Sequence, residues 1–112
     1  MDRGNPAVAP GIDGLHPAVL QLIAHTTEGA GRHRRWVGVC GGLASDRLAI
    51  PLLVGLGITE LSASPRFVPE LKALVRRLDT HRCRLLAVRA LAAASPAEVR
   101  TMVREFLQEQ GA

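Results

Sequence analysis

Residues 36–62 decide the fold of this chain, and they read WVGVCGGLASDRLAIPLLVGLGITELS. The first five residues form a short apolar run with β-branched side chains, bounded by a basic turn and a pair of glycines, which is typical of a buried strand in a parallel sheet. Residues 58–62 predict a second short strand. A strand, a helix and a second strand in succession predict a right-handed parallel unit.

The segment between the two strands predicts a helix from about residue 47 to residue 54. Asp46 precedes it and is a suitable N-cap. Pro51 falls inside this predicted helix and removes one backbone donor, so we expect the helix to be short or bent. Gly55 and Gly57 are expected to end it.

Upstream of this unit, residues 1–14 are rich in glycine and proline and predict a loop. Apolar residues then recur at helical spacing, which predicts a helix from about His16 to Glu28. Gly29 and Gly31 are expected to stop this helix.

Downstream, the chain is predicted to be wholly helical. Thr80 is a plausible N-cap for the second of three helices, and Ser95-Pro96-Ala97-Glu98 is a capping box with proline at the first helical position. Each helix carries an apolar stripe. The stripes are Val68, Leu71, Leu74, Val75 and Leu78; Cys83, Leu86, Ala87, Ala90 and Leu91; and Val99, Met102, Val103, Phe106 and Leu107.

Two parallel strands do not make a stable sheet by themselves, because a parallel sheet needs more strands and cover on both faces. The pattern therefore predicts an α/β chain that is part of a larger sheet or barrel. We divide the 112 residues into a loop at 1–14, strand–helix units at 15–64 and C-terminal helices at 65–112. Hydrophobic residues make up 47% of the chain and charged residues 21%, which excludes a disordered protein.

Cys40 is the first candidate for chemistry, because it ends the first predicted strand and two glycines follow it. Reactive groups in α/β sheets and barrels lie at the carboxyl ends of strands. Glycines there leave backbone amides open to a small anion. The alternative is an ordinary core cysteine, since free cysteine is among the most buried residue types.

A resemblance to a known family gives Cys40 a specific role. The stretch at 36–46 resembles the cysteine motif W-x-G-M-C-G-E-L-A-G-D of the Enzyme I family, the phosphoenolpyruvate–protein phosphotransferases of the bacterial sugar phosphotransferase system. ELSAS at 60–64 resembles the family's E-F-S-M-S, DRGN at 2–5 its D-R-G-N, and HPAVL at 16–20 its helix start. The chain departs from the motif at Gly42, where the family has glutamate, and at Ser45, where it has glycine. The Gly-Gly pair at 41–42 resembles the form of this motif in the multiphosphoryl transfer proteins, which serve the fructose branch of the phosphotransferase system.

The resemblance implies a fold and a site. The fold is a (β/α)8 TIM barrel that binds phosphoenolpyruvate (PEP) and Mg²⁺, of which this chain would be a C-terminal fragment with about two of eight strands. Cys40 falls on the acid that protonates the methylene carbon as the enolate becomes pyruvate, and Arg3 on an arginine that contacts the PEP phosphate. An arginine offers a permanent charge and a bidentate fork. Without the resemblance, Arg3 would be interpreted as a surface residue near a frayed terminus.

The function implied is transfer of phosphate from PEP to a protein histidine and on to a histidine-containing phosphocarrier protein. In the family, the phosphorylated histidine and the Mg²⁺ ligands lie upstream, so we expect the isolated chain to be inactive and to hold no metal. His16, His25, His33 and His81 are interpreted as structural or surface residues. The resemblance also implies a homodimer through the barrel domain. The alternatives are a non-catalytic interaction or dimerisation module derived from that barrel, and another PEP-utilising enzyme such as a pyruvate phosphate dikinase.

Other partner classes are less favoured. The formal charge is +4, with one dense basic run at Arg32-His33-Arg34-Arg35. We interpret this run as a solvated turn and expect no nucleic-acid partner, because no aromatic platform beyond Trp36 accompanies it. No apolar run is long enough to span a membrane. Two cysteines without metal-ligand spacing fit a reducing cytoplasm.

Overall fold

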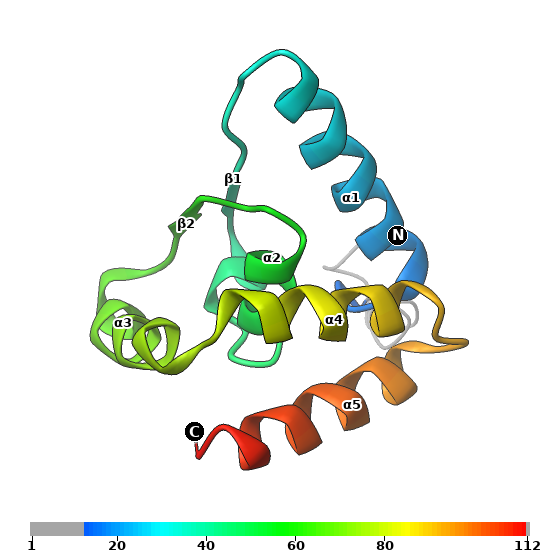
Figure 1. The fold of residues 1–112 in the computed structure, drawn as a ribbon. Coiled ribbons are helices and arrows are strands. Elements are labelled where there is room, and N and C mark those ends of the chain that lie inside the picture. The colour runs from blue at the N-terminus through cyan, green and yellow to red at the C-terminus, as the bar shows by residue number, and fades with distance from the viewer. Residues whose placement is uncertain (1–12, 112) are drawn as a thin grey trace, which may run out of the picture.

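A computed structural model of the chain describes residues 13–111. In these residues, a helix is followed by a strand–helix–strand unit and then by three helices (Figure 1). The elements are α1 (Pro17–Arg32), β1 (Gly38–Cys40), the 3-10 turn η2 (Gly42–Ser45), α2 (Ile50–Gly55), β2 (Glu60–Ser62), the 3-10 turn η3 (Pro65–Phe67), α3 (Val68–Arg77), α4 (Thr80–Leu91) and α5 (Pro96–Glu109). The predicted order of elements from the first helix onward is confirmed, whereas the predicted loop at 1–14 falls almost wholly outside the described residues.

The two strands form a parallel pair, as predicted. Gly38, Val39 and Cys40 lie in register with Glu60, Leu61 and Ser62. Val39 and Leu61 are half-buried against the core, whereas the first and last residues of both strands are exposed. Because successive side chains in a strand point to opposite faces, the helices cover one face of the pair only. The predicted burial of the first strand is therefore wrong in this chain, since the described residues leave its other face open.

The core lies between α2, α4, α5 and the start of α1, on the helical side of the strands (Figure 1). All three predicted stripes contribute to it, and most of their residues are buried. Val75, at 40% exposure, is the clearest exception. The core residues with no exposed surface are Leu15, Ala49, Ile50, Leu52, Leu53, Cys83, Ala90, Val99 and Val103.

Helix α1 is longer than predicted. It continues through Gly29 and Gly31 to Arg32, and Arg34 just after it has a positive φ of 55°. Glycine weakens a helix without ending it, and here an α-helical backbone is kept until the basic turn. The His16 side chain caps the start of α1 by accepting a hydrogen bond from the backbone N–H of Ala18.

Two predicted helix starts are shifted. Helix α2 begins at Ile50 with Ala49 as N-cap, so Pro51 lies in the first turn, where its missing N–H costs nothing. Asp79, not Thr80, caps α4, and its carboxylate accepts from the N–H of Arg82. The capping box of α5 is confirmed, because the Ser95 hydroxyl accepts from the N–H of Glu98.

Helices α2 and α4 approach each other closely at Gly55, at the end of α2. A Cβ atom added there would lie 2.1 Å from the carbonyl oxygen of Cys83 and 3.0 Å from the Cβ of Ala87, both on α4. No side chain fits between these two backbones. The contact brings α2, and with it the strand–helix–strand unit, against the C-terminal helices.

We predict that Gly55→Ala destabilises the chain by about 3 kcal/mol, because the methyl group overlaps backbone atoms that cannot move aside independently. Gly31→Ala is the matched control: it lies in α1, and an added Cβ there meets nothing within 4 Å. The control should raise the free energy of unfolding by about 0.5–1 kcal/mol. Urea denaturation followed by circular dichroism measures both changes. Equal effects of the two substitutions would contradict the close contact.

Candidate active site

Cys40 is the last residue of β1, and it is exposed. Its partner in register is Ser62, the last residue of β2, which is also exposed. Both side chains therefore point to the open face of the strand pair, opposite to Val39 and Leu61. The alternative that Cys40 is a core cysteine is wrong for this chain; Cys83 has that position, with no exposed surface. A thiol and a hydroxyl thus lie side by side at the carboxyl end of a parallel pair.

The loop after Cys40 is open to a small ligand. Gly41 has a positive φ of 81°, a conformation that favours glycine, and the 3-10 turn η2 starts at Gly42. A Cβ atom at either glycine would meet nothing within 4 Å. Ala44 in the same turn is fully buried and holds the loop to the core. The loop is therefore anchored at Ala44, while the backbone at Gly41 and Gly42 is open to a ligand.

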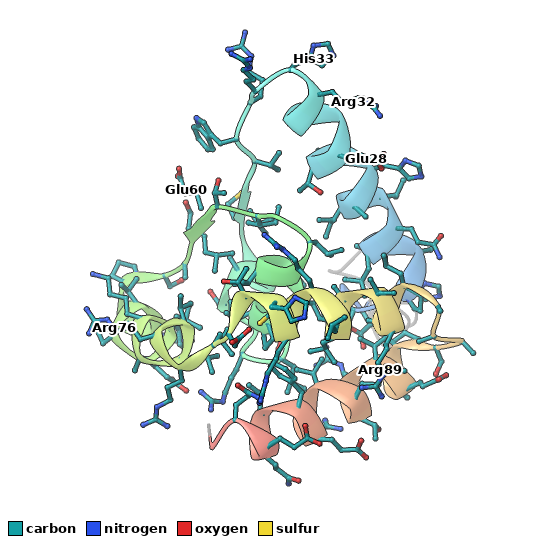
Figure 2. All side chains as sticks on the ribbon, in the orientation of Figure 1. Glu28, Arg32, His33, Glu60, Arg76 and Arg89 are labelled. Atoms are coloured by element: carbon teal, nitrogen blue, oxygen red, sulfur yellow. The ribbon has the colours of Figure 1, made fainter. Side chains whose placement is uncertain are left out.

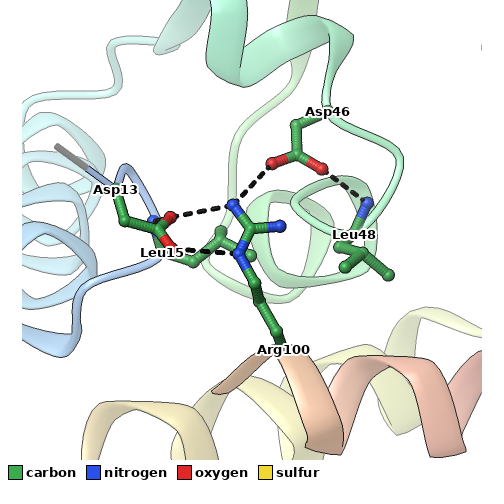
Figure 3. Close-up of polar contacts among 5 residues, drawn as sticks. All are labelled: Asp13, Leu15, Asp46, Leu48 and Arg100. Atoms are coloured by element: carbon green, nitrogen blue, oxygen red, sulfur yellow. Dashed lines mark hydrogen bonds and ion pairs between the residues drawn. The ribbon is translucent and has the colours of Figure 1, made fainter. Parts of the chain in front are cut away.

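A three-residue ion cluster lies behind this loop (Figure 3). From α5, Arg100 donates through Nε to Oδ2 of Asp13 at 2.9 Å and through Nη2 to Oδ1 of Asp13 at 2.8 Å. The same Nη2 donates to Oδ2 of Asp46 at 3.2 Å. All three side chains are partly buried, at 24–28% exposure. We call this cluster the arginine clasp.

Each carboxylate of the clasp also orders its own segment. Oδ1 of Asp13 accepts from the N–H of Leu15 at 2.9 Å, and Oδ1 of Asp46 accepts from the N–H of Leu48 at 3.0 Å. Asp46 was predicted as an N-cap; instead it follows η2 and closes a local turn before α2 begins. The clasp therefore joins the segment that enters α1, the loop between β1 and α2, and the C-terminal helix.

The clasp changes the ionisation of its members. The hydrogen bonds from Arg100 hold the pKa of Asp13 below its ordinary value, against the opposing effect of burial. The hydrogen bond with Asp13 raises the pKa of Arg100, with the charge of Asp46 adding to it. Both groups therefore stay charged at neutral pH. Sequence reasoning missed Asp13 and Arg100, because an arginine next to an apolar stripe and an aspartate before a helix are ordinary features.

The other predicted residues lie apart from Cys40 or outside the structure. Arg3 falls in residues 1–12, outside the described residues. The four histidines are exposed, as expected of surface residues. The basic run lies at the far tip of α1, where Figure 2 labels Arg32 and His33, away from the carboxyl end of β1.

Residues 13–111 contain no group of three or more His, Cys, Asp or Glu side chains that could hold a metal ion. No chemical step below passes through a metal ion. None of the helices described here is long and apolar enough to cross a membrane.

Fold and site together define the class: a parallel strand–helix–strand unit with an exposed thiol at the carboxyl end of a strand, the position of functional groups in α/β enzymes. Comparison with known families makes this specific. Residues 1–80 match the family described as PEP-utilising enzyme, PEP-binding domain. The chain belongs to this family, as the sequence motifs indicated.

The relatives with curated names agree. The chain is 46% identical over 102 residues to a multiphosphoryl transfer protein of Xanthomonas campestris pv. campestris, and 49% identical over 100 residues to one of Rhodobacter capsulatus. It is 37% identical over 109 residues to a phosphoenolpyruvate-protein phosphotransferase of Haemophilus influenzae. These matches cover 91%, 89% and 97% of this chain, but only 12%, 12% and 19% of the relatives.

The two cysteines should differ sharply in reactivity, because only a thiolate attacks an alkylating reagent. Burial raises the pKa of Cys83 to about 11, whereas Cys40 is exposed. We predict that iodoacetamide at pH 8 modifies Cys40 in the native chain and reaches Cys83 only after denaturation, as read by peptide mass spectrometry. Similar rates at both positions in the native chain would contradict the arrangement described.

The Asp13 pair should make stability depend on pH. Because the pKa of Asp13 is lower in the folded chain than its ordinary value of 3.8, its carboxylate stabilises the fold above that value. This contribution is lost as the pH falls through the lower, folded value. We predict that the free energy of unfolding of Asp13→Asn depends less on pH below about 4 than that of the parent chain. If the free energy of unfolding of Asp13→Asn has the same pH dependence as that of the parent chain, the ion pair between Asp13 and Arg100 does not form in solution.

Proposed function

We propose that the chain is the PEP-binding segment of a phosphoenolpyruvate-protein phosphotransferase, which transfers phosphate from PEP to a protein histidine and on to a histidine-containing phosphocarrier protein. The observation that carries the proposal is the agreement of two independent features. Relatives named multiphosphoryl transfer protein or phosphoenolpyruvate-protein phosphotransferase are 36–49% identical over most of the chain, and the motif cysteine Cys40 lies exposed at the carboxyl end of β1.

In this proposal Cys40 is the catalytic acid. Transfer of the phosphoryl group from PEP to a histidine nitrogen leaves the enolate of pyruvate. The S–H bond of Cys40 then breaks as a C–H bond forms at the methylene carbon, which gives pyruvate and a thiolate that solvent reprotonates. Exposure of the thiol and the open rim at Gly41 and Gly42 support access of a small anion to this point. General acid catalysis of this kind contributes about 10²–10⁴-fold to a rate.

The remaining substrate contacts lie outside the described residues. Arg3 is proposed as a ligand of the PEP phosphate, supported by its place in the DRGN stretch and by the bidentate geometry of a guanidinium. Mg²⁺ is proposed as the metal of the longer protein, held by residues that this chain does not supply. The two free cysteines support a cytoplasmic location.

We further propose that the strand pair belongs to a (β/α)8 barrel. The support is the one-sided cover of the pair: Val39 and Leu61 face the helices, while Cys40 and Ser62 face the open side, where a barrel interior would lie. A homodimer through this domain is also proposed. Two exposed apolar side chains, Trp36 at 70% and Leu22 at 68%, support a contact with another surface, either the rest of the barrel or a second copy of the chain.

A chimera tests the function. The chain replaces the matching segment of the Haemophilus influenzae phosphoenolpyruvate-protein phosphotransferase, to which it is 37% identical. The chimera should convert PEP to pyruvate and phosphorylate a protein histidine. Cys40→Ala should lower kcat for pyruvate release by about 100-fold or more, because the carbon acid step loses its donor.

Two controls accompany the chimera. Cys83→Ser removes the buried thiol, which lies on α4 away from the loop, and should leave the turnover of folded chimera within about twofold. The isolated 112-residue chain should not take up label from PEP. Full turnover of the Cys40→Ala chimera, or labelling of the isolated chain, would overturn the proposal.

A further inference from the structure

Arg100 lies on α5, beyond the residues that match the PEP-binding domain family, which end at residue 80. Its side chain nevertheless reaches back to two segments within that match, through Asp13 and Asp46. The separations along the chain are 87 and 54 residues. The C-terminal helix therefore does more than cover the core, because it also makes a polar contact with the loop that follows Cys40.

Each of the two segments that the clasp joins follows a residue with a proposed role in catalysis or substrate binding. Asp46 closes the loop that starts directly after Cys40, and Asp13 enters α1 in the segment that follows the DRGN stretch. The two segments also approach each other closely at Gly14, where an added Cβ atom would lie 2.8 Å from the side chain of Leu43 in η2. The clasp thus links the segment that enters α1 to the loop between β1 and α2.

The geometry at Arg100 suits a positioning role better than general stabilisation. A planar guanidinium that serves two carboxylates at once fixes their separation and orientation, as a lysine ammonium cannot. The first part of the loop has little packing of its own, because Gly41 and Gly42 have open surroundings and η2 is a single 3-10 turn. The rest of the loop packs on the core through buried Ala44 and Ala49 and through the partly buried Leu43.

We propose that Arg100 is a positioning residue, whose guanidinium holds the loop between β1 and α2 through Asp46 and thereby places the Cys40 thiol relative to the segment that enters α1. This inference rests on the proposed role of Cys40. The clasp acts at the loop rather than at the thiol itself, so its loss should alter the chemical step more than the binding of PEP.

Two variants isolate the arm of the clasp that faces the loop. Asp46→Asn keeps an oxygen that can accept from the N–H of Leu48 but removes the charge that faces Arg100, while the Asp13 pair stays intact. Arg100→Lys keeps the charge and loses the fork. Arg104→Lys is the matched control, because Arg104 is an exposed arginine one turn further along α5.

The first measurement is amide hydrogen exchange on the 112-residue chain. Asp46→Asn and Arg100→Lys should speed exchange of the amides at 41–48 by about tenfold, while the buried amides of α4 exchange at the parent rate. Arg104→Lys should leave both regions unchanged. Uniformly faster exchange would indicate a general loss of stability and overturn the proposal, as would unchanged exchange in the loop.

The second measurement is steady-state kinetics in the chimera. The two clasp variants should lower kcat for pyruvate release by about tenfold with KM for PEP within about twofold, since a small misplacement of a catalytic group costs rate. Equal kcat in Arg100→Lys and Arg104→Lys would overturn the positioning role. If Cys40→Ala retains turnover, the proposed function fails and the positioning role fails with it. If the clasp variants keep the parent kcat while Cys40→Ala is inactive, the positioning role fails and the proposed function stands.

Discussion

The close contact between α2 and α4 at Gly55 is the constraint on which the rest of the structure depends. At this point the backbones of the two helices approach so closely that a single methyl group would overlap a carbonyl oxygen of Cys83. Helix α2 connects the two strands, and α4 is the central C-terminal helix. Because the strands themselves are only three residues long, their position relative to the core is set mainly through this helix contact.

Polar contacts from Arg100 add to the apolar packing that holds the loop between β1 and α2. The loop between β1 and α2 has two buried residues, Ala44 and Ala49, and two glycines whose surroundings are open. Arg100 supplies the missing restraint from α5, with hydrogen bonds of 2.8–3.2 Å to Asp13 and Asp46. A half-buried, bidentate arginine contributes more geometric definition than a surface ion pair such as Glu28 with Arg32, whose two side chains are each 70% exposed. The reactive end of β1 is therefore held by both packing and charge.

The open face of the strand pair links the structure to the proposed chemistry. Cys40 and Ser62 stand on that face, and the helices cover only the other one. The same arrangement that exposes the thiol also leaves the strand pair uncovered on one side. The proposed barrel explains both the exposed thiol and the uncovered face. The uncovered face would line the barrel interior, and the thiol would lie at the carboxyl-terminal rim of the barrel.

The sequence by itself determined the order of elements, the parallel pair, the start of α5 and the family, because these depend on local patterns and on short motifs such as WVGVCGG and ELSAS. It placed the start of α2 and the end of α1 less well. Asp46 carries a local signal for a cap but closes a turn before α2, and Gly31 carries a signal for a stop but only weakens a helix without ending it. Only the tertiary structure decided that Cys40 is exposed while Cys83 is buried, and that Arg100 meets Asp13 and Asp46. The physical reason is that burial and long-range hydrogen bonds depend on which segments the core brings together, over separations of 54 and 87 residues that no local pattern records.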